Sequence, residues 1–491
     1  MNIYLIGNDD KYGAEQMLLT LYPTERPVYP EGPAEGDSVT LRLFRGERFA
    51  AAACRLSLGG KTFRGQARQS LARLGTGPDA VRRERHLLKL AFYRAALSAG
   101  HEKPVWGCLT GVRPAKFFAG LMDRDGLNFE EAERALVRRY GVEPDRAALC
   151  AAAARAAQAA RESLSPEDIC LYIGIPYCPT RCAYCSFVSV DAPRMLQTIP
   201  AYLSALRREM EAAAAAVRES GRRIAAVYIG GGTPTTLSPD ELRDLITSVR
   251  RIFDLSGCRE FTVEAGRPDT ITGEKLAVLR QLGVDRVSVN PQSMSDAVLA
   301  AIGRRHSAQE VRRAVEMVKE AGLAFNMDLI AGLPGDSPES FRETMEEVIA
   351  MGPENITVHT LALKKGSRFL TEGTALPSGE AVGQMLSFAG EALPRAGYGP
   401  YYMYRQKFMS GSFENVGWSR PGFENLYNIC IMEELCSILA LGAGGSTKLV
   451  GAGGLVRRQV NPKYPREYME RIEDLCAAKG SIPGFFQNKE E

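Results

Sequence analysis

From residue 170 to residue 363 the chain alternates short apolar runs with longer segments whose apolar residues recur at helical spacing. Segments such as SPDELRDLITSVRRIF and AQEVRRAVEMVKEAG have the period of amphipathic helices, and some helical stretches open with Ser-Pro or Thr. The apolar runs predict six buried strands, at Cys170–Pro176, Ala225–Gly230, Glu260–Gly266, Arg286–Gln292, Phe325–Pro334 and Ile356–Leu363. This alternation predicts a parallel sheet in a doubly wound fold or in a full or partial βα barrel, and both bind ligands at the carboxyl ends of strands.

The pattern differs on either side of this core. Residues 1 to about 75 alternate apolar and polar positions, which predicts a small antiparallel sheet with a turn at Gly59-Gly60. Helical spacing follows from Pro78 to about Glu162, and from about Gly399 the chain becomes aromatic and basic. We therefore predict an N-terminal α+β region (1–165), an α/β core (166–398) and a C-terminal substrate or lid region (399–491).

Composition narrows the class of protein. The chain has 61 Lys and Arg against 58 Asp and Glu, a net charge of +3 that argues against a nucleic-acid partner. No stretch reaches the roughly 18 uninterrupted apolar residues that predict a membrane span. The start, MNIYLIGNDD, lacks the basic segment of a signal peptide, so we expect a cytoplasmic protein. Its 11 cysteines are then expected to be reduced, and clustered ones to bind metal.

Three cysteines directly follow the first predicted core strand: Cys178, Cys182 and Cys185, in CPTRCAYC. Thiolates this close bind soft metals, and three of them suit a cubane iron–sulfur cluster that leaves one iron open for a small molecule. A structural zinc site would need a fourth ligand, and the nearest Cys or His is Cys170, within the strand itself. The motif alone leaves a cluster, a zinc site and inert thiols as interpretations.

The CxxxCxxC spacing, with Tyr184 before the last Cys, resembles the signature of radical S-adenosylmethionine (SAM) enzymes. The ordered stretches YIGIPYCPTRCAYCSF, YIGGGTPT, VEAGRP, NPQS, IGRRH and NMDLIAGLPGD resemble the motifs of the oxygen-independent coproporphyrinogen III oxidase group. The longer N-terminal region, with YYMYRQK, ENVGW and LGAGGSTK, is most similar to its coproporphyrinogen dehydrogenase branch. The resemblance implies an α/β fold, a partial (β/α)6 radical SAM barrel, to which the N-terminal α+β region and a lid-like C-terminal region are added.

The resemblance also implies a set of cofactor contacts. Cys178, Cys182 and Cys185 would bind three irons of a [4Fe-4S] cluster, and SAM would chelate the fourth iron. Asp328 stands in an otherwise apolar strand, where a buried carboxylate needs a partner that adenosine hydroxyls could provide. The implied SAM contacts are Tyr172, Tyr184 (beside the adenine), Gly231, Gly232 and Thr233 (beside the methionine moiety), Glu264, Gln292, Arg304, Asp328 and Ala362.

The implied reaction is the oxygen-independent oxidative decarboxylation of coproporphyrinogen III propionates to vinyl groups, which gives protoporphyrinogen IX in haem biosynthesis. The chain would be a radical SAM oxidoreductase that receives electrons from a donor such as flavodoxin or ferredoxin. One departure affects the substrate, because Phe187 stands where the best-studied oxidases have a further Cys, and radical haem chaperones share this CxF ending. A haem-binding chaperone and a radical methyltransferase acting on haem are therefore the alternatives.

Two further groups of residues have a functional and a structural interpretation. We expect His306 and His359 to lie in the core or at the surface, because no two His of this chain stand at ligand spacing. In the C-terminal region, aromatic and basic side chains either bind a flat tetrapyrrole and its carboxylates or serve packing: Tyr401, Tyr402, Tyr404, Arg405, Lys407, Trp418 and Arg420.

Overall fold

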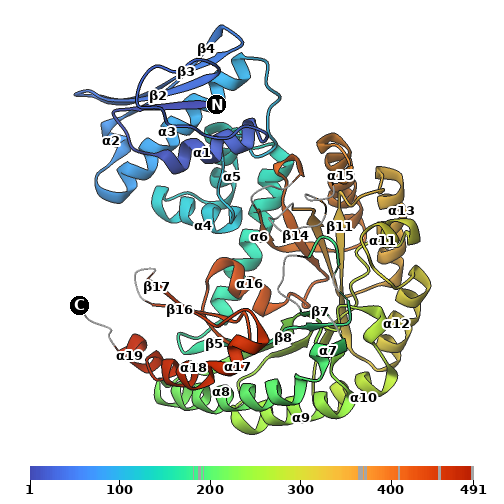
Figure 1. Cartoon of the computed structure of the whole chain (residues 1–491). Helices are drawn as coiled ribbons and strands as arrows, with labels where there is room; N and C mark the ends of the chain where they lie inside the picture. Colours follow the sequence, from blue (N-terminus) through green and yellow to red (C-terminus); the bar gives the residue numbers. More distant parts are fainter. Residues whose placement is uncertain are drawn as a thin grey trace. The chain divides into compact units, whose positions relative to one another are not determined.

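Figure 1 shows the chain as a computed structural model. The structure describes residues 1–180, 182–185, 190–191, 193–362, 369, 373–406, 410–451 and 455–487. The chain divides into two compact units, the first formed by residues 1–151 with 405–413 and the second by residues 152–404 with 414–491. Helix α6 (Pro144–Ser163) runs from the first unit into the second.

The N-terminal unit is built on a four-stranded sheet in the order β1-β2-β3-β4. The β3–β4 hairpin turns at Gly59 and Gly60, both with positive φ (50° and 80°), which confirms the predicted turn. The predicted antiparallel sheet is wrong in one respect, because β1 pairs parallel to β2 and α1 provides the crossover between them. The bounds are β1 (Asn2–Ile6), α1 (Lys11–Leu21), β2 (Ser38–Arg45), β3 (Phe49–Leu58) and β4 (Lys61–Ser70).

Helix α3 packs closely on the sheet of this unit. A Cβ at Gly65 of β4 would lie 2.0 Å from the carbonyl oxygen of Ala91 on α3, so only glycine allows this approach. Phe92 of α3 and Leu56 of β3 are fully buried in the same core. The helices are α2 (Leu71–Leu74), α3 (Gly77–Ser98), α4 (Pro114–Asp125) and α5 (Phe129–Tyr140).

The second unit contains an 11-stranded sheet, and six adjacent parallel strands in it follow chain order. They lie where the hydrophobic pattern predicts strands, and their interior residues are buried on both faces. The first and last of them do not pair, so the barrel is open, as the predicted partial (β/α)6 fold requires. They are β5 (Asp168–Ile175), β8 (Arg223–Gly231), β9 (Glu260–Val263), β10 (Arg286–Ser288), β11 (Ala324–Ala331) and β12 (Asn355–Thr360).

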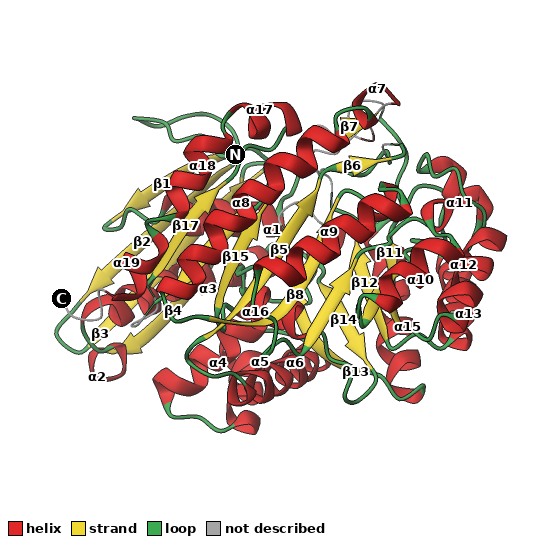
Figure 2. Cartoon of the chain, turned by 90° about the horizontal axis from the view of Figure 1, so that it is seen from below, coloured by secondary structure: helices red, strands yellow, loops and turns green. Residues whose placement is uncertain are grey.

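Helices connect the parallel strands, and α8 and α9 lie across one face of the sheet in Figure 2. Ser238 and Ser307 cap α9 and α12, each in a capping box with the glutamate three residues later, which explains why these helices begin there. The connecting helices are α7 (Pro193–Leu196), α8 (Ile199–Glu219), α9 (Pro239–Ile252), α10 (Gly273–Gln281), α11 (Asp296–Ala301), α12 (Ala308–Glu320), α13 (Pro338–Met351) and α15 (Gly379–Arg395).

The residues after 398 extend this sheet at both of its edges. Beyond β12 come antiparallel β14 (Asn415–Ser419) and β13 (Gly399–Tyr404), and beyond β5 come β15 (Ser437–Leu441), β16 (Ser446–Val450) and β17 (Val456–Val460). A covering role for this region over the barrel mouth stays a prediction. Its helices are α16 (Leu426–Glu433), α17 (Pro465–Glu470), α18 (Ile472–Lys479) and α19 (Ile482–Gln487).

Candidate functional site

The carboxyl ends of the six parallel strands lie at one edge of the sheet, and most of the predicted cofactor residues stand there. Tyr172 and Asp328 lie within β5 and β11, and the other predicted residues lie at or after strand ends. The cysteine loop follows β5, Gly231 to Thr233 end β8, Glu264 follows β9, Gln292 follows β10, and half-buried Ala362 follows β12.

The cysteine loop begins at β6 (Tyr177–Cys178), and all three of its thiols are half-buried. The Cys178 Sγ lies 3.4 Å from the Thr233 hydroxyl, and the Cys185 N–H donates to the Cys182 carbonyl at 3.1 Å. The loop is also attached to the barrel, since the Ala183 N–H donates to the Ile302 carbonyl. These thiols can therefore be reached by a metal ion. Phe187, which distinguishes the alternative functions, lies outside the described residues.

Arg267, which the sequence analysis did not single out, places a positive charge beside this loop. Its guanidinium donates to the Thr180 hydroxyl at 2.6 Å and lies 4.0 Å from the Cys182 Sγ. Its other face forms a paired contact with Asp269, at 2.9 and 2.7 Å. The Arg267 side chain is buried, so its charge lies next to the predicted cluster loop and away from solvent. The signal was present in the stretch VEAGRP, where Arg267 follows Glu264.

The glycines after β8 allow two backbone segments to approach closely. A Cβ at Gly232 would lie 2.5 Å from the carbonyl oxygen of Tyr177, and Gly231 has a φ of 112°. The next residue, Thr233, donates its N–H to the same Tyr177 carbonyl at 2.7 Å. Glycine is therefore needed here to hold the end of β8 against the start of the cysteine loop.

Glu264 lies half-buried beside these glycines. The Tyr228 hydroxyl donates to its Oε1 at 2.6 Å, and the Gly231 N–H donates to its Oε2 at 3.2 Å. Burial raises the pKa of Glu264 to about 7, although both hydrogen bonds lower it, and the charge of Asp328 adds to the rise. The site thus contains a carboxyl group that changes protonation near neutral pH.

Three tyrosines form a stack beside Glu264. The ring of Tyr228 lies 4.4 Å from that of Tyr427 and 6.3 Å from that of Tyr172, with all three rings nearly parallel. Tyr427 comes from α16, far along the chain from the core strands, and the sequence analysis did not single it out. Predicted residue Tyr172 is therefore part of an aromatic cluster to which the C-terminal region contributes.

Arg304, which follows α11, contacts Tyr184 of the cysteine loop. The Arg304 Nη2 donates to the Tyr184 hydroxyl at 2.8 Å. The Nε and Nη1 atoms of Arg304 are buried and have no hydrogen-bond partner among the described residues. A buried, partly unpaired guanidinium suits an anionic ligand group. His306 is buried nearby in sequence, as predicted for a core residue.

Asp328 and Gln292 are joined through their backbones. The Gln292 N–H donates to the Asp328 carbonyl at 3.0 Å, and Gln292 has an unusual φ of 69°. The Asn326 amide donates to the Asp328 carboxylate at 3.3 Å, and the His359 Nε2 lies 3.9 Å from it. His359 also contacts the Tyr404 hydroxyl. Asp328 is thus only partly neutralised and keeps acceptor capacity.

The C-terminal aromatic residues mainly serve packing. Tyr401, Tyr402 and Trp418 are buried within the edge strands, with the first two rings 4.7 Å apart. Arg420 is exposed and lies over the ring of Tyr398. Arg405 belongs to the N-terminal unit, where its guanidinium donates to the carbonyls of Leu109 and Ser412 and lies over Trp106. Lys407 lies outside the described residues.

A second group of thiols lies in the core, apart from the cysteine loop. Cys170, Cys430 and Cys436 are buried with their sulfur atoms within 4.8 Å of one another. Hydrogen bonds from Cys430 and Cys436, together with burial, raise the pKa of Cys170 well above its ordinary value. The sequence did not predict this group, because its members come from β5, α16 and the loop before β15.

The residues at the barrel mouth fit the predicted cofactors. Three accessible thiols on one loop beside Arg267 suit an iron–sulfur cluster. The partly unpaired Arg304 and the carboxylates of Glu264 and Asp328 suit a ligand with both acidic and basic groups. Among the described helices, none is both long and apolar enough to cross a membrane.

Comparison with known proteins identifies the family. Residues 172–348 match the family described as the radical SAM superfamily. A Bacillus subtilis protein described as "oxygen-independent coproporphyrinogen-III oxidase-like protein HemZ" is 39% identical over 381 residues, 76% of each chain. The Escherichia coli heme chaperone HemW is 28% identical over 61% of this chain and 75% of that one. The solved structure of the Escherichia coli coproporphyrinogen III oxidase HemN has a TM-score of 0.51 at 22% identity, covering 66% of this chain and 73% of that chain.

The chain contains a radical SAM domain, and it belongs to the oxygen-independent coproporphyrinogen-III oxidase-like family that includes HemZ. This superfamily uses a [4Fe-4S] cluster and SAM, so the predicted family, fold and cofactors are confirmed.

Proposed function

We propose that the protein oxidatively decarboxylates coproporphyrinogen III propionates to vinyl groups and so forms protoporphyrinogen IX. The observation that carries this proposal is the 39% identity to the HemZ protein, which extends over 76% of both chains. An oxygen-independent coproporphyrinogen III oxidase of Bradyrhizobium diazoefficiens is also 33% identical over 46% of this chain.

We assign the cluster to Cys178, Cys182 and Cys185, next to the positive charge of Arg267. SAM would then lie against Gly231 to Thr233, Glu264, Gln292, Arg304, Asp328 and Ala362, with Tyr184 beside the adenine. When bound, the cluster and SAM would supply the radical chemistry for removing a hydrogen atom from a propionate side chain. The protein's own residues would bind and orient these molecules, with the half-buried Glu264 held by Tyr228 and Gly231.

The overall reaction oxidises the substrate, so the protein would need a final electron acceptor. Cleavage of SAM consumes an electron, so the protein would also need a reducing partner. Electrons for SAM cleavage would come from a small donor such as flavodoxin or ferredoxin. The substrate is a tetrapyrrole with four propionates, and no membrane or nucleic-acid partner is required.

The rival function is a haem chaperone, which the 28% identity to heme chaperone HemW and the CxF ending at Phe187 favour. Anaerobic incubation with coproporphyrinogen III, SAM and a reductant, followed by porphyrin analysis, tests the two functions. The oxidase forms divinyl porphyrin and carbon dioxide, and the Cys178→Ala variant forms neither. Tight haem binding without vinyl product would overturn the proposal and favour the chaperone.

A further inference from the structure

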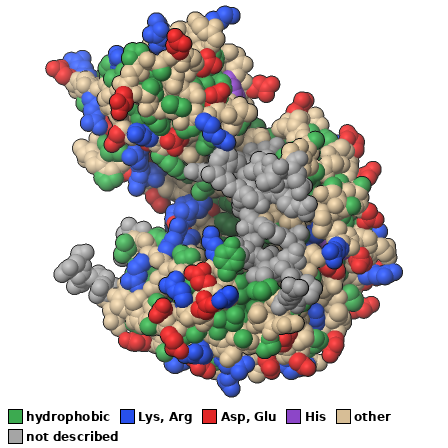
Figure 3. All heavy atoms as spheres, in the orientation of Figure 1, with side chains coloured by type: hydrophobic (Ala, Val, Ile, Leu, Met, Phe, Trp, Pro, Cys, Tyr) green, Lys and Arg blue, Asp and Glu red, His purple; other side chains and the backbone are tan. Residues whose placement is uncertain are grey.

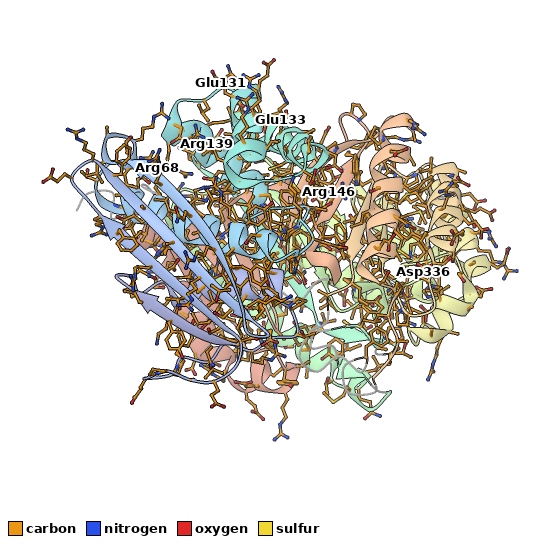
Figure 4. The ribbon with its side chains drawn as sticks, turned by 90° about the horizontal axis from the view of Figure 1, so that it is seen from above. Arg68, Glu131, Glu133, Arg139, Arg146 and Asp336 are labelled. Carbon is orange, nitrogen blue, oxygen red and sulfur yellow. The ribbon has the colours of Figure 1, made fainter. Side chains whose placement is uncertain are left out.

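The N-terminal unit contains a large groove of about 1050 Å³ that the radical SAM core does not use. It lies between β4, α3, α4 and α5, and ten Arg and Lys side chains line it against three Asp. Figure 3 shows Lys and Arg side chains on this unit, and Figure 4 labels Arg68 of the sheet and Arg139 of α5, which both line the groove. Such an excess of one charge around a hollow creates an attractive field for anions.

The three aspartates form ion pairs with four of these cations. Asp79 pairs with Arg82 at 2.9 Å, and Asp10 lies 3.6 Å from Arg85. Asp125 pairs with both Arg83 and Arg139. In the described part of the unit no carboxylate lies within ion-pair distance of the six other cations, which are Arg68, Arg73, Lys89, Arg94, Arg124 and Arg138.

Two groups of α3 face the groove without an ionic partner. The Lys89 ammonium is half-buried and donates only to the Thr110 hydroxyl, at 3.3 Å, among the described residues. Burial lowers the pKa of Lys89, and the charge of Arg85 adds to this, although Cys108 and Asp10 raise it. The His86 Nδ1 is buried without a hydrogen-bond partner there, and its ring lies 4.2 Å from that of Tyr140. A bound anion would accept a hydrogen bond from the Lys89 ammonium.

The rest of the lining is apolar and aromatic. Phe49, Leu90, Phe117 and Leu121 line the groove, and Arg68 and Arg124 lie over the rings of Phe49 and Phe117. A simple inorganic anion would leave this apolar surface unused. A flat apolar molecule with several carboxylates at its rim would contact both kinds of lining, and the hollow has the volume of a small-molecule site.

We propose that this groove binds a tetrapyrrole that carries several carboxylates, at a site in the N-terminal unit additional to the barrel mouth. The choice of tetrapyrrole over other aromatic polycarboxylates rests on the proposed function. The groove would hold substrate or product of the same reaction through Lys89 and the unpaired arginines.

The probe is coproporphyrin III, the stable oxidised tetrapyrrole, added to the full chain without reductant so that no turnover occurs. Arg73→Gln/Arg138→Gln changes two exposed groove cations, and Arg134→Gln changes an exposed cation on α5 that does not line the groove. We expect the double variant to bind coproporphyrin at least tenfold more weakly than Arg134→Gln, and equal thermal midpoints to show that both fold. Hydrogen exchange should show protection of α3 on binding in the wild type.

Three results would overturn the proposal. The first is equal coproporphyrin affinity in the two variants, and the second is absence of protection on α3. The third is that the wild type binds a single-stranded RNA oligonucleotide more tightly than coproporphyrin and that only the double variant loses this RNA binding. The tetramethyl ester of the porphyrin lacks the carboxylate charges. We expect the wild type to bind this ester at least tenfold more weakly than it binds coproporphyrin III. Because binding is measured without turnover, a failure of the oxidase assay and a failure of this site are separate outcomes.

Discussion

The Tyr228 hydroxyl donates a 2.6 Å hydrogen bond to Glu264, while the ring of Tyr228 stacks on Tyr427 at 4.4 Å. This one side chain connects the acid after β9 with α16 of the C-terminal region. The C-terminal region therefore extends the edges of the sheet and also contributes Tyr427 to the aromatic cluster beside Glu264.

Glu264 makes stability depend on pH in the protein freed of SAM. Its folded-state pKa is about 7 and its ordinary value is 4.5, so between these values the folded protein holds a proton that the unfolded chain has released. The stabilisation from Glu264 is present below about pH 4.5 and is lost as the pH rises to 7, on the order of 3 kcal/mol in all. Denaturant unfolding of wild type and Glu264→Gln across pH 4.5–7.5 should show their difference in free energy of unfolding falling with pH. A constant or rising difference would contradict this prediction.

Replacing cysteines of the two groups should have opposite effects on the iron content of the protein. Replacing Cys178, Cys182 or Cys185 by Ser should abolish the visible absorption and the iron content of the anaerobically reconstituted protein. The matched controls are Cys170→Ser and Cys436→Ser, which should keep both, because these buried thiols already hydrogen-bond one another. Iron that persists in Cys178→Ser and is lost in Cys170→Ser would assign the cluster to the other group.

Arg304 should contribute strongly to SAM binding. Two of its buried guanidinium nitrogens have no partner among the described residues, and a charge-assisted hydrogen bond typically contributes about 1.5–3 kcal/mol. Arg304→Gln should weaken SAM binding roughly ten- to a hundredfold. Its exposed neighbour supplies the control, Arg305→Gln. Calorimetric titration of SAM into cluster-loaded protein measures both, and equal affinities would show that Arg304 does not contact the ligand.

Gly232 should be intolerant of a side chain. In Gly232→Ala the new Cβ would meet backbone atoms of Tyr177 at 2.5 and 2.8 Å, so the cysteine loop must shift. We expect a loss of about 1–3 kcal/mol in stability and a reduced iron content after reconstitution. Gly390→Ala, in the exposed interior of α15 with open space around it, should instead stabilise the protein by about 0.5–1 kcal/mol. A Gly232→Ala variant that unfolds like the wild type and takes up full iron would show that this approach is not needed.

The hydrophobic pattern was sufficient to predict the six parallel strands, because each is buried on both faces and bounded by helices. It could not predict where β14 and β15 join the sheet, because β14 pairs antiparallel to β12 and β15 pairs parallel to β5, and each pairing joins residues far apart in sequence. Arg405 shows the same limit. Its basic and aromatic neighbours in sequence left a ligand surface and packing both open, and its partners, Leu109 and Trp106, lie far back along the chain in the same unit.

The site residues also divide into those that the sequence predicted and those that it did not. The cysteine motif was predictable from its spacing, and Glu264 was predicted from the resemblance of the ordered motifs to a known family. Arg267, Tyr228 and Tyr427 act through side-chain contacts with those residues, and a single sequence gives no distance between them. Prediction from pattern therefore reached the groups that would touch the cofactors and missed the groups that position them.

The most direct test of the proposed reaction is the mass of the 5′-deoxyadenosine formed from coproporphyrinogen III deuterated on its propionate chains. Anaerobic incubation with SAM and a reductant should give 5′-deoxyadenosine that is one mass unit heavier, together with vinyl product. Unlabelled 5′-deoxyadenosine with no vinyl product, in protein that carries its full cluster, would contradict the oxidase account.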